Sequence, residues 1–319
     1  MKPKIKNNGI NAAAGVGKLA ANIILYIFLF SLSYVILYPL LYAISQAFRT
    51  PADVYNANVI WLPTTLTLEN FKTLWNGINY PELFKNTVII CLVTAFMQIV
   101  VCSVTGYGLA RFKFKEKGFW IIVLLITVVV PPQIVSVPNF FLYKQFDPLG
   151  LLALLKNTVG IDVKIGLLDS FAVYFIPALL GQGIRSGIFI LIFRQFFHGL
   201  PQELEDAAYV DGAGPIKTFL SVMLPNCKAA IVVVFLFSLV WYWNDTYIGS
   251  MYTESLETVS VRLALINSDI TSMGLQVDRM TQSLYTQAGV LISILPLLIL
   301  FLFCQKAFVE SVERTGIVG

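Results

Sequence analysis

Few residues of this chain have the types and spacing that catalysis requires. His198 is the only histidine, so a zinc site of the HExxH kind is excluded and a Ser/His/Asp triad has only this base to use. We expect His198 to be a polar loop residue. The sequence therefore indicates no catalytic or metal site. The cysteines lie in or next to apolar segments without CxxC or Cys/His ligand spacing, which favours small apolar roles: they are Cys91, Cys102, Cys227 and Cys304.

A glycine-rich stretch near the N-terminus, from Gly15 to Lys18, ends in the Gly-Lys pair of a phosphate-binding loop. It lacks the other residues that such a loop needs. Ala12 occupies the position of the first glycine, and Leu19 that of the Ser or Thr whose hydroxyl would reach magnesium. We therefore expect neither an ATP site nor any other cofactor on this chain.

The most distinctive polar segment is residues 200–225, which read LPQELEDAAYVDGAGPIKTFLSVMLP. This pattern predicts two short helices joined by a turn. Pro201 suits the first helical position, Gly212 suits the left-handed conformation that ends a helix, and Pro215 suits the start of the next one. Three acids in the first turn favour the positive end of the helix dipole: they are Glu203, Glu205 and Asp206.

One face of the first of these helices is predicted to be small and apolar with acids beside it. Leu204, Ala207, Ala208 and Asp211 recur at the spacing that brings residues to one side of a helix. Helices that lie on lipid carry bulky apolar and basic residues instead. The acidic, small-sided face therefore favours docking into a protein groove over binding to an anionic membrane.

Apolar helices must position this segment. Hydrophobic residues make up 57% of the chain and charged residues 13%, and the mean hydropathy of +0.76 excludes an ordinary soluble domain. Apolar runs long enough to cross roughly 30 Å of hydrocarbon predict an all-α integral membrane protein with six transmembrane helices. The membrane domain is expected over 19–308, between tails at 1–18 and 309–319. The predicted spans are about 19–47, 86–110, 118–143, 170–197, 229–248 and 281–305.

Charged residues or paired prolines interrupt three of the six predicted spans. Arg185 and Arg194 fall within the fourth span, and Asp245 lies near the end of the fifth. Pro131 and Pro132 of the third span have no N–H group and are expected to break the helical hydrogen-bond ladder there. The first apolar run is too long for a signal peptide and is expected to be retained as a span.

Basic residues in the short segments between spans set the orientation. With six spans, every basic cluster falls on one side, which predicts that both termini and residues 201–225 are cytoplasmic. The net charge of +4 is therefore a topology signal and not a nucleic-acid footprint. The clusters are Lys2, Lys4, Lys6 and Lys18; Arg111, Lys113, Lys115 and Lys117; and Lys217 and Lys228.

The polar segment resembles the EAA loop of ABC importer permeases. That loop reads Glu-Ala-Ala, two residues, Asp-Gly, and then Ile-x-Leu-Pro. Residues 206–213 read DAAYVDGA, and residues 222–225 read VMLP. In the family this loop forms the coupling helices that sit in a cleft of the nucleotide-binding subunit. Asp206 occupies the glutamate position and Glu205 stands just before it, so two carboxylates are candidates for the ATPase contact.

The resemblance extends over nearly the whole chain and is to the carbohydrate-uptake branch of these permeases. Two departures are an alanine, Ala229, where a proline is common, and a longer outer loop at 144–169, which could alter contact with a binding protein. The supporting residues are Glu69-Asn70-Phe71, Asn86-Thr87, Tyr107-Gly108-Leu109-Ala110-Arg111-Phe112, Pro131-Pro132-Gln133, Arg194-Gln195-Phe196-Phe197, Trp243-Asn244-Asp245, Ala288-Gly289, Pro296 and Gln305.

The resemblance implies a type I ABC importer permease fold, and a transport subunit rather than an enzyme, in a prokaryotic cytoplasmic (inner) membrane. Expected partners are a second homologous permease, two copies of a cytoplasmic ATPase that hold ATP and Mg, and an extracytoplasmic solute-binding protein that delivers a sugar. The residues expected to couple to the ATPase are Glu205, Asp206, Ala207, Ala208, Asp211, Gly212, Ala213, Leu224 and Pro225.

Five residues are candidates for a substrate path, because charge inside a membrane must be paired or wetted. Arg185 and Asp245 are the charged ones. Alternatively, Arg185 lies at an unwound or water-exposed outer part of the fourth span, and Asp245 marks the end of the fifth. Tyr242, Trp243 and Asn244 suit sugar binding through stacking and amide hydrogen bonds, but an aromatic belt at the membrane surface is an equal interpretation.

Two other functions are alternatives to sugar import. An importer permease for a non-sugar solute, such as a polyamine or glycerol phosphate, carries the same loop. An ion-coupled secondary transporter is expected to place carboxylates or discontinuous helices at the membrane midplane. The four clearest predicted spans contain no acid, which disfavours the second alternative.

Overall fold

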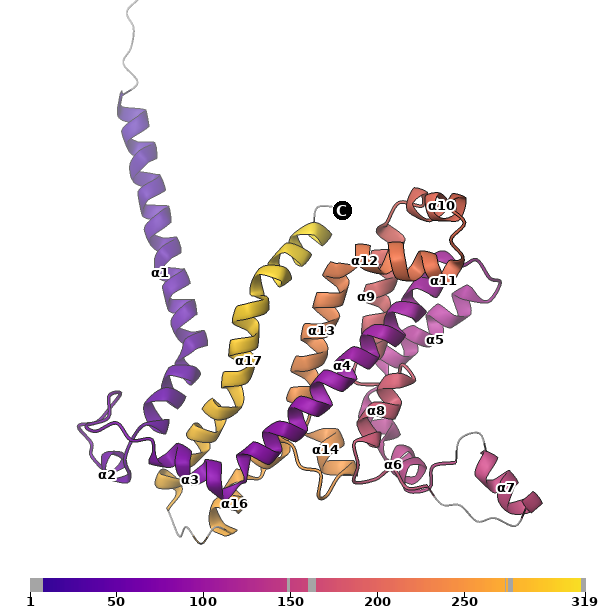
Figure 1. Cartoon of the computed structure of the whole chain (residues 1–319). Coiled ribbons are helices and arrows are strands. Elements are labelled where there is room, and N and C mark those ends of the chain that lie inside the picture. Colours follow the sequence, from indigo (N-terminus) through magenta and orange to yellow (C-terminus); the bar gives the residue numbers. More distant parts are fainter. Residues whose placement is uncertain (1–7, 148–149, 160–164, 273, 275–277, 317–319) are drawn as a thin grey trace, which may run out of the picture. The chain divides into compact units, whose positions relative to one another are not determined.

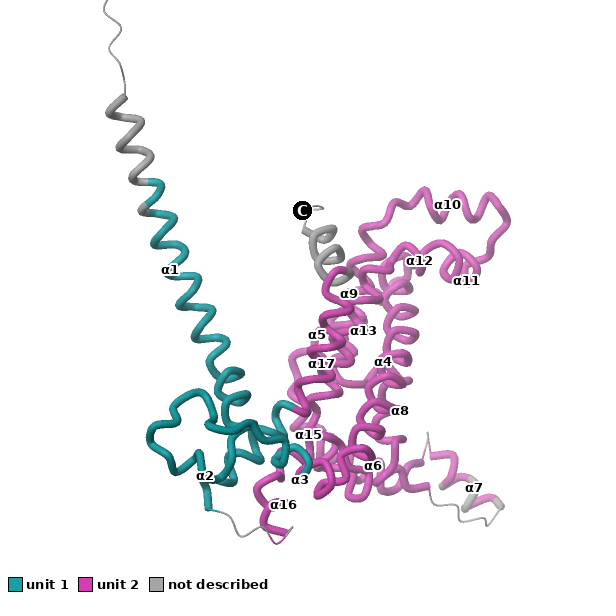
Figure 2. The backbone as a smooth tube through the Cα atoms, turned by 60° about the vertical axis from the view of Figure 1, so that its left-hand side comes forward, with its two compact units in different colours: residues 1–73, 275–291 teal, residues 74–274, 292–319 magenta. Residues whose placement is uncertain are grey.

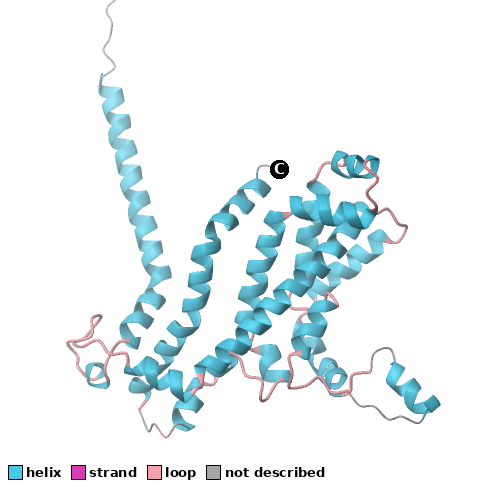
Figure 3. Cartoon of the chain, in the orientation of Figure 1, coloured by secondary structure: helices cyan, strands magenta, loops and turns pink. Residues whose placement is uncertain are grey.

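The computed structural model describes residues 8–147, 150–159, 165–272, 274 and 278–316. The described residues form helices and loops without a strand, as predicted (Figure 3). Several earlier predictions lie outside the described residues: those on Lys2, Lys4 and Lys6, on parts of the 144–169 loop, and on residues 317–319 of the C-terminal tail.

Contacts divide the chain into two compact units (Figure 2). Unit 1 comprises residues 1–73 and 275–291, and unit 2 comprises residues 74–274 and 292–319. The helices expected to position the polar segment belong to unit 2.

Three helices are long and apolar enough to cross a membrane. They are residues Ala21–Ala47 of α1 (Asn8–Ala47), the whole of α4 (Tyr80–Arg111), and Arg279–Lys306 of α17 (Arg279–Gly316). They correspond to the first, second and sixth predicted spans. Two further bent pairs of helices raise the number of candidate spans to as many as five among the described residues, by length and composition.

The third predicted span is bent rather than continuous. α5 (Lys117–Val129) ends before Pro131, a short 3-10 helix, η1 (Pro132–Val135), follows, and α6 (Ser136–Lys144) completes a pair bent by 93°. Val130 has the extended backbone that a following proline favours, with φ −68° and ψ 120°. The expected break at these prolines is confirmed.

The fourth predicted span is two helices, α8 (Ala172–Leu179) and α9 (Ser186–Gly199). Between them Gly181 and Arg185 both have left-handed backbone conformations, with φ of 72° and 59°. A helix cannot pass through two such residues. The prediction of one helix over 170–197 is therefore wrong, and Arg185 lies in the unwound part that was its alternative interpretation.

The fifth predicted span is shorter than expected. α13 (Lys228–Trp243) follows α12 (Leu224–Asn226) at a bend of 77° and ends before Asp245. The carboxylate of Asp245 accepts hydrogen bonds from the N–H groups of Ile248 and Gly249, both at 3.2 Å, so it starts α14 (Tyr247–Tyr252). This contact explains why the span ends there instead of continuing to residue 248.

α4 is the central helix of unit 2 and packs against α8, α9 and α13 (Figure 1). Its closest approach is at Gly106, where a Cβ atom would lie 2.7 Å from Cβ of Phe193, 2.9 Å from the N atom of Arg194 and 3.0 Å from the carbonyl oxygen of Ile190. Two of these three neighbours are backbone atoms of α9, which cannot rotate away. The α4–α9 crossing therefore requires glycine.

Gly106→Ala is expected to destabilise the folded chain by about 1–3 kcal/mol, because overpacking forces the two helices apart. The measurement is the melting temperature and the monodisperse yield of the detergent-purified protein. Gly108→Ala is the matched control, since its Cβ would meet only a Phe112 ring atom at 4.0 Å. Equal stability of the two variants would show that the crossing is not tight.

The remaining elements are short. Within unit 1, the buried Asn70 donates from its amide to the carbonyl oxygens of Ala47 at 2.8 Å and Arg49 at 2.9 Å, fixing the end of α1. The Tyr55 hydroxyl donates to Asp278 at 2.5 Å and, with other donors, lowers the pKa of that carboxyl to about 2. The short helices are α2 (Pro51–Val54), α3 (Glu69–Gly77), α7 (Leu151–Val159), α15 (Val259–Ala264) and α16 (Ile266–Ser272).

Asp169 holds two loops of unit 2 together, the loop before α8 and the loop after α14. Asp169 accepts hydrogen bonds from the N–H groups of Glu254, Ser255 and Leu256 at 2.8, 2.7 and 3.1 Å. These bonds and one from the Ser255 hydroxyl hold the pKa of Asp169 well below its usual range. The loop before α8 is thereby fixed to the loop after α14.

Candidate functional site

The polar segment forms two short helices at one end of unit 2 (Figure 1). α10 (Glu203–Val210) is followed by a turn and by α11 (Pro215–Thr218), which continues through a single π-helical turn, η3 (Phe219–Met223), into α12. Pro215 opens α11 as predicted. The prediction for Pro201 is wrong, because the first turn of α10 starts from the carbonyl of Gln202, which accepts from the N–H groups of Glu205 and Asp206.

The turn after α10 depends on Gly212, which has φ 77°. The N–H of Gly212 donates to the carbonyl of Tyr209 at 3.0 Å, and the N–H of Ala213 donates to that of Ala208 at 2.9 Å. This pattern satisfies the last carbonyls of α10 and ends it with a left-handed glycine. The left-handed conformation expected at Gly212 is confirmed.

Glu205 faces inward and anchors α10 to α4. Its side chain is only 8% exposed, and its Oε1 accepts a hydrogen bond from the Tyr107 hydroxyl at 2.7 Å. Oε2 lies 3.4 Å from Nε of Arg111, an ion pair rather than a directed hydrogen bond. The Arg111 Nη2 also donates to the carbonyl of Leu200 at 2.6 Å. Tyr107 and Arg111, four residues apart on α4, therefore both hold Glu205, and Arg111 also holds the backbone at Leu200, just before α10.

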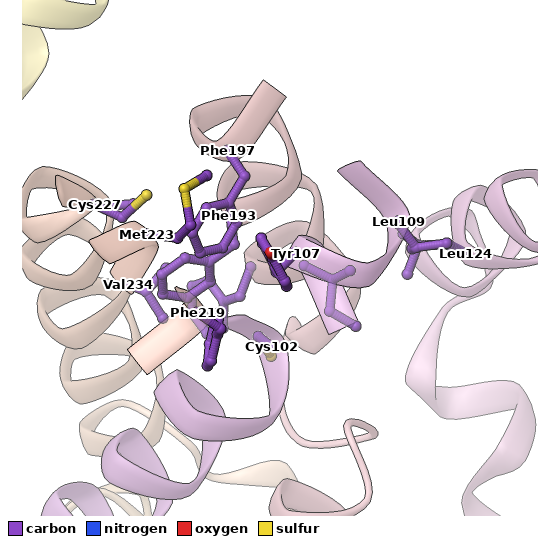
Figure 4. Packing of buried hydrophobic residues seen from close by; sticks show 13 residues of the cluster. Cys102, Tyr107, Leu109, Leu124, Phe193, Phe197, Phe219, Met223, Cys227 and Val234 are labelled. Atoms are coloured by element: carbon purple, nitrogen blue, oxygen red, sulfur yellow. The ribbon is translucent and has the colours of Figure 1, made fainter. Parts of the chain in front are cut away.

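Aromatic packing shields this anchor from solvent. The ring of Tyr107 lies 5.3 Å from that of Phe197 and 5.0 Å from that of Phe219, between centroids. Figure 4 shows Phe193 and Met223 beside them, so α4, α9 and η3 all contribute to one cluster. A carboxylate and a guanidinium enclosed in this way interact more strongly than they would in water.

The outward face of the segment carries the other predicted docking residues. Asp206, Ala207, Asp211 and Gly212 are exposed, whereas Ala208 is buried. The predicted small face is therefore divided between the interior and the surface. Ala213, Leu224 and Leu204 are half-buried, and Pro225 is exposed.

Large apolar side chains surround the outward acids. Val210 is 87% exposed, Ile216 76% and Leu220 55%. A shallow hollow of about 500 Å³ lies on α11 and the start of η3, and its surface is almost entirely apolar. Its lining residues are Gly214, Pro215, Ile216, Lys217, Leu220 and Ser221. Exposed apolar residues grouped around a few acids are typical of a protein-docking surface.

The residues predicted for a substrate path do not come together as one group. Tyr242 is buried and its hydroxyl accepts from the N–H of Ile184 at 3.0 Å. Trp243 is also buried and donates from Nε1 to the carbonyl of Ser293 at 3.1 Å. Asp245 caps α14, as described above. Only Asn244 and Arg185 are exposed, and the Arg185 guanidinium lies 5.7 Å from the centroid of the Trp241 ring.

Three side chains of α4 were missed as functional candidates by the sequence analysis. Tyr107 and Arg111 hold Glu205, and their spacing of four on one helix was the available signal. The third, Gln98, is fully buried and donates to the Ile184 carbonyl at 2.8 Å, beside the break between α8 and α9. A single glutamine in an apolar run gave no sign of this contact.

Metal-binding geometry is absent from the part of the chain that the structure describes. No three His, Cys, Asp or Glu residues there are close enough to hold an ion.

The fold and the site define a class: an all-α membrane subunit that presents an acidic helix–turn–helix surface at one end. The chain belongs to the family of binding-protein-dependent transport system inner membrane components, whose model matches residues 102–314.

Relatives and a solved structure extend over most of the chain. A probable ABC transporter permease protein of Bacillus subtilis (strain 168), YurM, is 30% identical over 92% of this chain and 88% of its own length. The maltodextrin transport system permease protein MdxG of the same organism is 28% identical over 96% and 99%. The structure of a bacterial ABC transporter that imports the acidic polysaccharide alginate matches with TM-score 0.69 and 18% identity, over 96% of this chain and 100% of that one, which shows the shared fold.

Proposed function

We propose that this chain is one of two membrane subunits of an ATP-driven importer that takes up oligosaccharides delivered by an external binding protein. Membership of the family of binding-protein-dependent transport system components supports the assignment as an importer subunit. The sugar class is supported by relatives named for maltodextrin and arabinooligosaccharides, at 28% and 26% identity over at least 90% of this chain. The proposal includes six spans with both termini cytoplasmic, in which α8 and α9 together supply the fourth.

The surface of α10 and α11 is proposed to dock onto the cytoplasmic ATPase. Two observations support this role: the acids and apolar residues project outward together, and the segment is braced from behind by α4. Because the Glu205 carboxylate is buried and bound by Tyr107 and Arg111, Asp206 is the carboxylate that can reach the ATPase. ATP and Mg bind to that partner, and no covalent step occurs on this chain.

Asp206→Ala is expected to lower sugar uptake about tenfold, since losing a charge-assisted hydrogen bond costs about 1.5–3 kcal/mol. Asp206→Glu should keep near-normal uptake because it preserves the carboxylate. The measurement is uptake and ATP hydrolysis by the complete importer in proteoliposomes. Glu203→Ala is the matched control, since Glu203 is exposed on the same first turn. Normal uptake by Asp206→Ala would assign the ATPase contact to another residue.

The transport cycle follows from this anchoring. When the ATPase subunits close on ATP, they move α10, and the Glu205 anchor passes that displacement to α4 and the helices packed on it. Alternating access then arises as a rigid-body movement between two states that the ATPase binds with different affinity.

A second candidate cargo is glycerol phosphate. The sn-glycerol-3-phosphate transport system permease protein UgpE of Salmonella typhimurium is 26% identical over 87% of this chain and 90% of its own length. The experiment that separates the candidates is co-purification of the membrane complex, followed by a panel of sugars and glycerol phosphate against its binding protein. Binding of oligosaccharides supports the proposal, and selective binding of glycerol phosphate would replace it.

A further inference from the structure

An arginine without an ion-pair partner among the described residues lies at the break between α8 and α9 of unit 2. Arg185 is exposed, precedes the first residue of α9, and has the left-handed conformation with φ 59°. Among the described residues, the contact recorded for its side chain is with the Trp241 ring, whose centroid lies 5.7 Å from Cζ of Arg185. The side chain therefore projects from the break between α8 and α9 with its guanidinium hydrogen-bond donors free.

Three helices independently give the depth of this arginine. Ser186, next to it, accepts a hydrogen bond from Gln98, which precedes the end of α4 at Arg111 by thirteen residues, about 20 Å at helical rise. Trp241 follows the start of α13 at Lys228 by a similar distance, and Arg185 precedes the end of α9 at Gly199 by about 20 Å. The guanidinium thus lies about 20 Å from one end of each of these helices, a depth that falls inside a hydrocarbon layer about 30 Å thick.

The carboxylate of Asp245 does not neutralise this charge. Asp245 directs its two oxygens to the N–H groups of Ile248 and Gly249, and no ion pair with Arg185 exists among the residues that the structure describes. A charge at membrane depth is costly unless it is paired or faces a water-filled cavity, and it therefore marks a functional site. No acid among the described residues pairs with it, so the guanidinium is open to water or to a group supplied from outside the described chain.

The surroundings hold the guanidinium in place and leave one face open. Gln98 donates to the carbonyl of Ile184 and accepts from the Ser238 hydroxyl at 2.6 Å, so the backbone before Arg185 is braced by a fully buried amide. The face of the Trp241 ring lies against the guanidinium. Asn244, the residue that follows α13, is exposed, and its amide donates to the Val240 carbonyl at 2.7 Å. A face that combines a cation, an amide and aromatic rings suits a polar ligand better than lipid.

We propose that Arg185 forms a binding subsite for an anionic group of the imported solute, a carboxylate or a phosphate. The planar guanidinium can donate two parallel hydrogen bonds to either group, and its stacking on Trp241 orients it without neutralising it. The N-terminus of α9 adds a positive dipole at the same place. This inference rests on the proposed importer function and narrows the cargo to acidic sugars or sugar phosphates.

The test uses the complete importer, with its ATPase and binding protein, in proteoliposomes. The probes are a uronate trisaccharide, a sugar phosphate and a neutral trisaccharide, which separate the two sources of anion from the sugar itself. Arg185→Gln is compared with Arg185→Lys and with Lys113→Gln, a control that removes an exposed positive charge elsewhere. The wild type should import one anionic probe, and Arg185→Gln should raise the KM for that probe at least tenfold, with partial rescue by lysine.

Three results would overturn the subsite: wild-type import of the neutral probe alone, unchanged anionic import by Arg185→Gln, or equal loss of neutral and anionic import. The third result would indicate that Arg185 pairs with an acid of the second permease. In each of these cases sugar import by the wild type still stands, so the proposed function survives. Failure of the wild type to import any of the sugars would count against the proposed function as well.

Discussion

Gly212→Val is expected to give a chain that inserts and assembles normally but transports no sugar and no longer couples ATP hydrolysis to uptake. Gly212 has φ 77°, and a Cβ atom there would meet nothing within 4 Å. The penalty is therefore in the backbone. Holding a β-branched residue in this left-handed conformation costs roughly 1–3 kcal/mol. The turn must reorganise, which displaces α11 from α10 and disrupts the outward surface, while the buried core is untouched.

A matched glycine separates backbone strain from a simple change of side chain. Gly214 also has open space around its Cβ position, but its φ of −74° is accessible to any residue. Gly214→Ala should therefore transport at nearly the wild-type rate. Uptake and substrate-stimulated ATP hydrolysis in proteoliposomes measure both variants, after size-exclusion chromatography has shown intact complexes. A well-assembled Gly212→Val importer with normal uptake would refute the role assigned to this turn.

The second large effect is expected from breaking the Glu205 anchor. Removing one partner of a buried ion pair leaves an uncompensated charge and costs about 3–5 kcal/mol. Glu205→Leu should therefore release α10 from α4, lower the melting temperature of the complex and reduce coupled uptake more than a hundredfold. Tyr107→Phe removes one hydrogen bond to the carboxylate and keeps the ion pair, so it should have a smaller effect, about 1.5–3 kcal/mol.

A double-mutant cycle tests whether the pair acts as a unit. Arg111→Met combined with Glu205→Leu removes both charges, so its melting temperature should recover toward the wild type relative to either single variant. Uptake should stay low, because the Leu200 carbonyl also loses its donor. Additive losses of stability in the double variant would mean that the 3.4 Å contact carries no coupling energy.

The sequence was most informative where the pattern was local or long. Uninterrupted apolar runs predicted α1, α4 and α17, and the Gly212 and Pro215 positions predicted the turn between α10 and α11. The bends were harder to place. Pro131 predicted the bend between α5 and α6. The break before α9 instead has Arg185 in a left-handed backbone conformation, and hydrogen bonds from Gln98 and to Tyr242 hold the preceding residue, Ile184.

The burial of Glu205 could not be read from the segment itself. Glu205 and Asp206 are adjacent acids on a short helix, and the choice between them depends on Tyr107 and Arg111, about a hundred residues away in the chain. Helical periodicity predicts that adjacent residues point in different directions but does not say which one points inward. Only the tertiary contact decides it.

The unbroken course of α4 has a mechanical consequence. α1, α8 and α17 each contain an interior proline, whereas α4 has none beyond its first turn. The same helix touches Glu205 at one end and, through Gln98, the break beside Arg185 about 20 Å away. A shift imposed on α10 therefore reaches the break before α9 without passing a proline kink in α4. The stiffness of α4 would then determine how much of a movement imposed on α10 is transmitted to the break beside Arg185.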